Sequence, residues 1–178
     1  GGTWDALPDN YTEEQRDKLI KYLATFNHTS PFRHNSITIR MRIPIFLARQ
    51  LGKHQVGMSW NEVSRRYVDT PPEFHYPAVW RDRPDGSIKQ GSAGESDSNS
   101  KWQYFYEEYL RDIQGIYADM LSDGIAPEQA RMILPQSMLT EVIWTGSLMA
   151  FAHVYKLRAD THAQVEAQEF AKELDSII

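Results

Sequence analysis

The residues best suited to chemistry lie between Lys53 and Tyr67, where most side chains can donate or accept strong hydrogen bonds. Lys53, Arg65 and Arg66 are cationic, and the planar guanidinium of arginine matches the geometry of a phosphate group. Ser64 adds a hydroxyl donor beside the two arginines. Such a segment makes a good lining for an anionic, hydrogen-bonding ligand. The alternative is a solvated loop whose arginines form only weak surface ion pairs.

Other catalytic chemistries have little support in the residue types. The chain has no cysteine, which excludes disulfides, thiolate metal sites and cysteine nucleophiles within it. Ser64 lacks the flanking glycines of a nucleophile elbow. No two histidines stand at i and i+4, the spacing that puts two imidazoles on one helix face, so we expect no metal site. The histidines are His28, His34, His54, His75, His153 and His162.

The residues just before the polar stretch must hold it in place. Apolar and polar side chains alternate from Ile37 to Ile43, which predicts a strand with one buried face. Pro44 suits the first turn of a short apolar helix. Gly52 is expected to end that helix, because glycine can adopt the left-handed conformation found at helix C-termini.

Further helices are predicted on both sides of this segment. Thr12 to Gln15 reads as a capping box that opens a helix ending near Asn27. An aromatic stripe at helical spacing predicts a long amphipathic helix from Trp102 to Leu121, with Gly124 as its end and its stripe in the core or at a subunit interface. Pro127 begins a short helix that carries Arg131 and stops at Pro135.

The last third of the chain predicts one strand and two helices. Residues 139–145 are β-rich, and Ser147 can cap a helix running through Tyr155. Thr161 to Gln164 forms another capping-box pattern before the last helix. With residues 69–77 extended, the expected fold class is α+β, a small, mostly antiparallel sheet with packed helices.

Composition limits the remaining possibilities. With 178 residues the chain is expected to form a single domain, 1–178, and residues 82–100, rich in Gly, Ser, Asp and Asn, are expected to form a flexible loop. A net charge of −5 argues against a nucleic-acid partner. No apolar run approaches the roughly 20 residues that span a bilayer, so we expect no membrane segment and a cytoplasmic protein. The chain starts at Gly1 without a methionine, and we expect its N-terminus to be incomplete.

Three motifs, in order along nearly the whole chain, resemble those of the flavin-dependent thymidylate synthases. A-R-Q-x-x-K-H-Q followed by N-E-V-S-R-R-Y is similar to that family's R-H-R and S-x-N-E-x-S-x-R-Y core. The upstream N-H-T-S-P-F-R-H resembles its G-H-x-T-P-F-x-H, and L-R-A-D-T-H-A-Q resembles its L-R-x-D-x-H-A-Q. Lys53 and Gln55 replace the two arginines that flank the motif histidine, and the spacer after His54 is slightly longer.

The resemblance implies a set of site residues. The positions that bind the nucleotide monophosphate in the family are Gln50, Glu62, Ser64, Arg65, Arg66, Arg131 and Arg158. The positions that contribute to the flavin and folate sites are His28, Ser30, Lys53, His54, Gln55, Asn61, Ser147 and His153. Arg158 matches the catalytic arginine that stabilises the ionised pyrimidine. For a lone histidine such as His28 or His153, a purely structural role is the competing interpretation.

The resemblance also implies an activity. NADPH reduces FAD, methylenetetrahydrofolate supplies a one-carbon unit, and dUMP is reductively methylated at C5 to dTMP by an enzyme that is a homotetramer. A hydride route of this kind does not need a thiolate to add to the pyrimidine, which agrees with the absence of cysteine. The changes at Lys53 and Gln55 leave open hydroxymethylation of dUMP or action on dCMP. A non-catalytic nucleotide-binding homologue and a purely structural helical module also stay open as interpretations.

Overall fold

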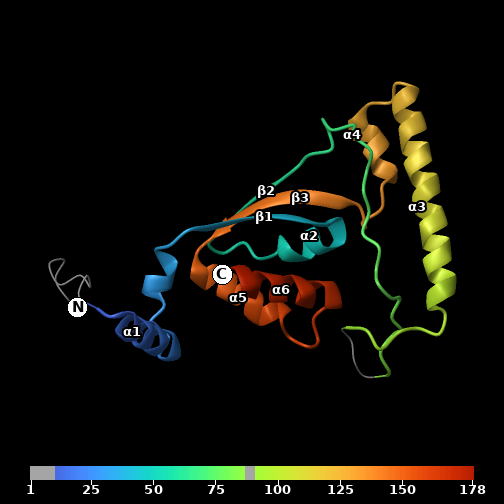
Figure 1. Cartoon of the computed structure of the whole chain (residues 1–178). Coiled ribbons are helices and arrows are strands. Elements are labelled where there is room, and N and C mark those ends of the chain that lie inside the picture. Colours follow the sequence, from blue (N-terminus) through green and yellow to red (C-terminus); the bar gives the residue numbers. More distant parts are fainter. Residues whose placement is uncertain (1–10, 87–90) are drawn as a thin grey trace.

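A computed structural model describes residues 11–86 and 91–178. It confirms the α+β class, since helices pack on a three-stranded antiparallel sheet (Figure 1). In chain order the elements are α1 (Glu13–Thr25), η2 (Ser30–Arg33), β1 (Ile37–Pro44), α2 (Ile45–Leu51), β2 (Met58–Glu62), α3 (Asn99–Ser122), α4 (Pro127–Ala130), η3 (Arg131–Ile133), β3 (Leu139–Gly146), α5 (Leu148–Arg158) and α6 (Val165–Ile177).

Strand β3 is the centre of the sheet, with β1 and β2 on either side of it. Because successive side chains of a strand point to opposite faces, Thr140, Val142 and Trp144 all face the buried side. Helices α2, α5 and α6 cover that side (Figure 1). Trp144 has no exposed surface and packs edge-to-face against Trp60 of β2 and Phe151 of α5. The core therefore lies between one face of the sheet and these helices.

The predicted helix signals are largely confirmed. Thr12 and Gln15 form the expected reciprocal capping box at the start of α1. The hydroxyl of Ser147 accepts a hydrogen bond from the N–H of Ala150 and caps α5, which continues past Tyr155 to Arg158. Gly124, at φ 84°, follows the last turn of α3, and the N–H groups of residues 124 and 125 donate to carbonyls of that turn.

Gly52 ends α2 as predicted, but with φ −62°, in the right-handed region, so the left-handed conformation expected of it is wrong. The predicted start of the last helix is also wrong. Helix α6 begins at Val165 after Gln164, with no side-chain cap, so Thr161 to Gln164 is not a capping box. The physical reason is a competing turn, in which the carboxylate of Asp160 accepts hydrogen bonds from the backbone N–H and the ring Nδ1 of His162.

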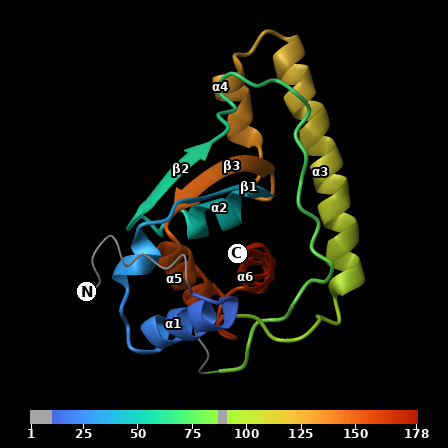
Figure 2. The same cartoon turned by 60° about the vertical axis from the view of Figure 1, so that its left-hand side comes forward.

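A long segment joins the sheet to α3. From Glu73 to Glu95 its described residues form only isolated bridges, Phe74 with Met138 and Arg81 with Glu95. Part of it runs beside α3 (Figure 2), where Tyr106 donates to the carbonyl of His75 at 2.8 Å. Phe74, Leu110 and Met138 make a second small core there. Residues 87–90 of the expected loop lie outside the described residues, and its flexibility stays a prediction.

None of the helices in the described ranges combines the length and apolar character that crossing a membrane requires.

Candidate functional site

Five of the eight residues predicted for the flavin and folate sites line one cavity, cavity A, of about 770 Å³. Its walls come from the segment after η2, from the loop between α2 and β2, and from the end of β3 with the first turns of α5. The lining residues are Arg33, Asn35, Ser36, Lys53, His54, Gln55, Val56, Gly57, Met58, Ser59, Thr145, Gly146, Ser147, Met149, Ala150 and His153. Five of the predicted positions thus meet here, namely Lys53, His54, Gln55, Ser147 and His153.

Cavity A is electrostatically suited to an anion. Arg33 and Lys53 bring positive charge to it, and no aspartate or glutamate stands among the described residues that line it. The N-terminus of α5 also meets the cavity, and the partial positive charge of a helix N-terminus favours an anion nearby. The chain as a whole carries a net charge of −5, so this is a local concentration of cationic character.

Four of the seven predicted nucleotide-binding residues line a smaller cavity, cavity C, of about 310 Å³. Glu62, Ser64, Arg65 and Arg131 line it, together with apolar side chains from α2 and from the segment before β3. Glu62 is held from two sides, because Thr140 donates to its Oε1 at 3.0 Å and the Trp60 indole donates to its Oε2 at 3.4 Å. The sequence therefore predicted this cluster, although Thr140 and Trp60 were not foreseen as its supports.

The two arginines of the central motif have different surroundings. The Arg65 guanidinium donates to the carbonyl of Thr70 at 2.7 Å and lies over the ring of Tyr117. It therefore fastens the following loop to α3 as well as lining cavity C. Arg66 is half-exposed, stacks over Tyr67 and lies 3.6 Å from the carboxylate of Glu128. Only weak surface contacts hold Arg66, so a phosphate can recruit it at little cost.

A third cavity shares lining residues with each of these two. Cavity B, of about 1020 Å³, shares Lys53, His54, Gln55 and Met58 with cavity A. It shares Ile45 and Glu62 with cavity C. The three cavities therefore share walls along β2, from Met58 at its start to Glu62 at its end. Neighbouring cavities of this kind suit a reaction between two bound molecules.

Arg158 is hydrogen-bonded to His54, which lines both cavity A and cavity B. The Arg158 Nε donates to His54 Nε2 at 3.0 Å, and its Nη2 lies 3.5 Å from the carbonyl of Gln50 at the end of α2. Burial, then the charges of Arg158 and His153, lower the pKa of His54, and burial lowers the pKa of Arg158. The imidazole is therefore held neutral, as an acceptor must be to receive this hydrogen bond.

The remaining predicted residues lie outside the three cavities. Arg158 is behind His54, and the side-chain Oε1 of Gln50 is buried with no hydrogen-bond partner among the described residues. Asn61 lies on the exposed face of β2, opposite Ile143. His28 sits near Tyr22 between α1 and η2, and Ser30 begins η2. The structure brings neither His28 nor Ser30 to cavity A.

Arg33 and Asn35 are among the residues of cavity A that sequence reasoning missed. Arg33 lies inside the N-H-T-S-P-F-R-H motif but was not singled out, since its position in the motif is variable. Asn35 accepts a hydrogen bond from the N–H of Leu148 at 2.7 Å, which ties the segment after η2 to the start of α5. Its partner is far away in the sequence, so no local pattern could have identified it.

The residues present fit a flavin dinucleotide. Cavity A has a volume within the usual range of cofactor pockets, roughly 300–1,000 Å³. Arg33, Lys53 and the first turn of α5 suit a diphosphate, and the Gln55 amide, Ser147 and His153 offer further polar groups.

Comparison with known proteins identifies the family. A family model described as thymidylate synthase complementing protein matches residues 3–178. A flavin-dependent thymidylate synthase of Kosmotoga olearia is 39% identical over 162 residues, covering 90% of this chain and 70% of the relative. Another, from Thermosipho africanus, is 34% identical over 167 residues, covering 93% and 73%.

A solved structure agrees with this assignment. The UMP/dUMP methylase PolB of Streptomyces cacaoi, bound with 5-Br UMP, superposes with a TM-score of 0.78 at 29% identity, covering 89% of this chain and 75% of that one. Fold, motifs and sequence similarity thus agree over nearly the whole length of the chain, which belongs to the flavin-dependent thymidylate synthase family.

Proposed function

We propose that this chain reductively methylates dUMP to dTMP with methylenetetrahydrofolate as the carbon donor and FAD as the redox cofactor, reduced by NADPH. The observation that carries the proposal is that cavities A, B and C share lining residues, which brings the predicted flavin-site residues next to the predicted nucleotide-site residues. Membership of the family supports the roles that the motif resemblance implies for these two groups of residues.

Each group of residues has a task under this proposal. Lys53, His54, Gln55, Ser147 and His153 hold the flavin in cavity A, and Ser64, Arg66 and Arg131 bind the nucleotide phosphate around cavity C. FAD, when bound, supplies the hydride that completes the methyl group. Glu62, fixed by Thr140 and Trp60, orients the nucleotide. Arg158 favours the anionic form of the pyrimidine ring, and its bond to His54 sets the direction of its guanidinium.

A second substrate is favoured by a specific observation. The structural neighbour PolB is named a UMP/dUMP methylase and holds 5-Br UMP. A ribonucleotide is therefore a candidate substrate beside dUMP. Lys53 and Gln55 in place of the two motif arginines also keep hydroxymethylation of dUMP and action on dCMP as candidate reactions.

The binding test uses flavin fluorescence. FAD titrated into the flavin-free protein is expected to give a saturable change. No saturable change with FAD in large excess would remove the flavin-dependent function.

The activity test uses product analysis. Protein, FAD, NADPH and methylenetetrahydrofolate are incubated separately with dUMP, UMP and dCMP, and the bases are identified by mass spectrometry. Thymine from dUMP is the expected product. A hydroxymethylated base, or product from UMP or dCMP alone, would replace the proposed reaction with that one. Flavin and nucleotide binding without any product would indicate a non-catalytic homologue.

A further inference from the structure

Arg33 is the cation of cavity A that the central motif does not supply. It is the last residue of η2, its side chain is exposed, and it lines the cavity together with Lys53 and Gln55. Among the described residues it forms no salt bridge. Its positive charge is therefore not neutralised by a neighbouring carboxylate in the part of the chain that the structure describes.

The charge of Arg33 is needed because the central motif supplies fewer cations to cavity A than the family's motif does. Gln55 is neutral where the resemblance expects an arginine, and Lys53 offers a point charge without the planar fork of arginine. A diphosphate in cavity A would meet only one full cation from that loop. Arg33 brings a second cation, with fork geometry, from a different segment of the chain.

The segment that carries Arg33 is fixed relative to α5. Two residues beyond Arg33, the side-chain oxygen of Asn35 accepts the N–H of Leu148 at 2.7 Å. The Ser147 hydroxyl accepts a hydrogen bond from the N–H of Ala150 at 3.2 Å. Between them, the N–H of Met149 has no partner within the helix, and Met149 lines cavity A. Arg33 and the positive end of α5 are thereby held at the same cavity.

We propose that Arg33, together with the first turn of α5, forms a diphosphate subsite in cavity A that compensates for the charge missing at Gln55. The inference rests on the proposed flavin-dependent function and adds to it the residue that recognises the anionic part of the cofactor. Two dinucleotides in the reaction contain a diphosphate, FAD and NADPH, and the experiment separates them.

The experiment compares Arg33→Gln with Arg33→Lys and with Lys172→Gln, an exposed charge on α6 that lines none of the three cavities. Affinities are measured for FAD, ADP, riboflavin and NADPH. Arg33→Gln is expected to weaken FAD and ADP by about 10-fold or more and to leave riboflavin unchanged. Arg33→Lys should lose less affinity for FAD and ADP, and Lys172→Gln should lose none. A loss for NADPH rather than FAD would assign the subsite to the reductant and overturn the cofactor assignment.

A second variant tests the compensation. Gln55→Arg should tighten FAD binding, and in that background the cost of Arg33→Gln should shrink. If Arg33→Gln weakens FAD binding equally with Gln55 and with Gln55→Arg, Arg33 does not compensate for the charge missing at Gln55. Arg33→Met, which keeps the apolar stem, repeats the test if Arg33→Gln does not fold.

The failures are distinguishable. Absence of FAD binding in the unaltered protein would overturn the proposed function and this inference with it. Normal FAD binding in both the unaltered protein and Arg33→Gln would overturn this inference alone.

Discussion

At the scale of single residues, the hydrogen bond between Arg158 and His54 links two parts of the site that are 104 positions apart. Arg158 is the last residue of α5, and its Nη2 also reaches the carbonyl of Gln50 at the end of α2. A cation near the C-terminus of α2 is favourable there. Arg158 therefore has a structural role and a proposed catalytic one, and experiments must separate the two.

Arg158→Lys is the variant that separates them. Lysine keeps the charge but cannot satisfy His54 and the Gln50 carbonyl in one fixed plane. Turnover is expected to fall by about 100-fold if roughly 3 kcal/mol of transition-state stabilisation is lost. The measurement is single-turnover oxidation of the reduced enzyme with dUMP and methylenetetrahydrofolate, beside a melting curve. Lys156→Gln on the same helix is the control. A folded Arg158→Lys protein with normal turnover would remove Arg158 from catalysis.

His54 predicts a pH dependence of stability. Burial and the neighbouring cations lower its pKa below 6.5 in the folded state. Above that value the imidazole is neutral in both states and carries no penalty. As the pH falls below it, the unfolded chain takes up a proton that the folded protein does not, so stability falls.

The comparison uses His54→Gln, whose amide oxygen can still accept from Arg158. Urea midpoints at about pH 7.5 and about pH 5.5 should differ less in this variant than in the unaltered protein. An equal drop in both proteins would show that His54 does not cause the acid sensitivity.

At the scale of elements, the start of α5 joins the fold to cavity A. The hydroxyl of Ser147, the N-cap residue of α5, accepts the N–H of Ala150. The side-chain oxygen of Asn35, in the segment before β1, accepts the N–H of Leu148. Ser147 also lines the cavity, so its predicted role in the flavin site and its observed role as a cap coincide. The start of α5 therefore contributes to the stability of the fold and also faces cavity A.

Substitutions of Ser147 distinguish capping from binding. Ser147→Ala should lower the free energy of unfolding by about 1 kcal/mol, because the N–H of Ala150 loses its acceptor. Ser147→Asp restores an acceptor and should restore stability, yet it places a negative charge in cavity A and should weaken FAD binding. Urea unfolding and FAD titration are the two measurements. Recovery of both properties in Ser147→Asp would contradict the anion-binding character of cavity A.

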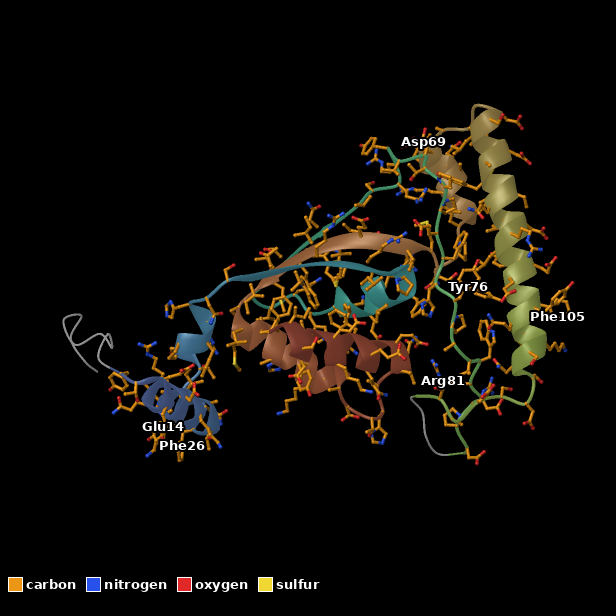
Figure 3. The ribbon with its side chains drawn as sticks, in the orientation of Figure 1. Glu14, Phe26, Asp69, Tyr76, Arg81 and Phe105 are labelled. Atoms are coloured by element: carbon orange, nitrogen blue, oxygen red, sulfur yellow. The ribbon has the colours of Figure 1, made fainter. Side chains whose placement is uncertain are left out.

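At the scale of the whole molecule, two helices have little to pack against. Helix α1 has no buried residue, although Leu19, Ile20, Tyr22 and Phe26 are apolar. Helix α3 buries only Leu110 and Tyr117 and leaves Trp102, Tyr104, Phe105, Tyr109 and Ile116 exposed. Phe26 and Phe105 lie at opposite extremes of the molecule (Figure 3). A helix of 13 residues is only marginally stable without packing, which motivates the prediction that other chains cover these surfaces.

We expect a homotetramer, with α1 and α3 packed against other copies of this chain. Light scattering should give a mass well above the 20.6 kDa of one chain. Phe105→Lys should dissociate the assembly or weaken it, because a charge replaces a large apolar side chain. Asp112→Lys, an exposed position on the same helix, is the control. A stable and active monomer would contradict the expectation.

The sequence alone determined most of the local structure and part of the membership of the two residue clusters. Alternation from Ile37 to Ile43, the Thr12 capping box and the Ser147 cap all act over a few residues, so their outcome is written in neighbouring side chains. The motifs likewise named Lys53 to Gln55 for cavity A, and Glu62, Ser64 and Arg131 for cavity C.

Only the tertiary structure decided how these parts meet. Strand β2, M-S-W-N-E, has only two apolar side chains, Met58 and Trp60, and it becomes a strand because β3 pairs with it. Asn35 with Leu148, Arg158 with His54, and Arg33 in cavity A each join segments far apart in the chain. Such contacts depend on which surfaces the packed sheet and helices bring together, and no local pattern of residues encodes that.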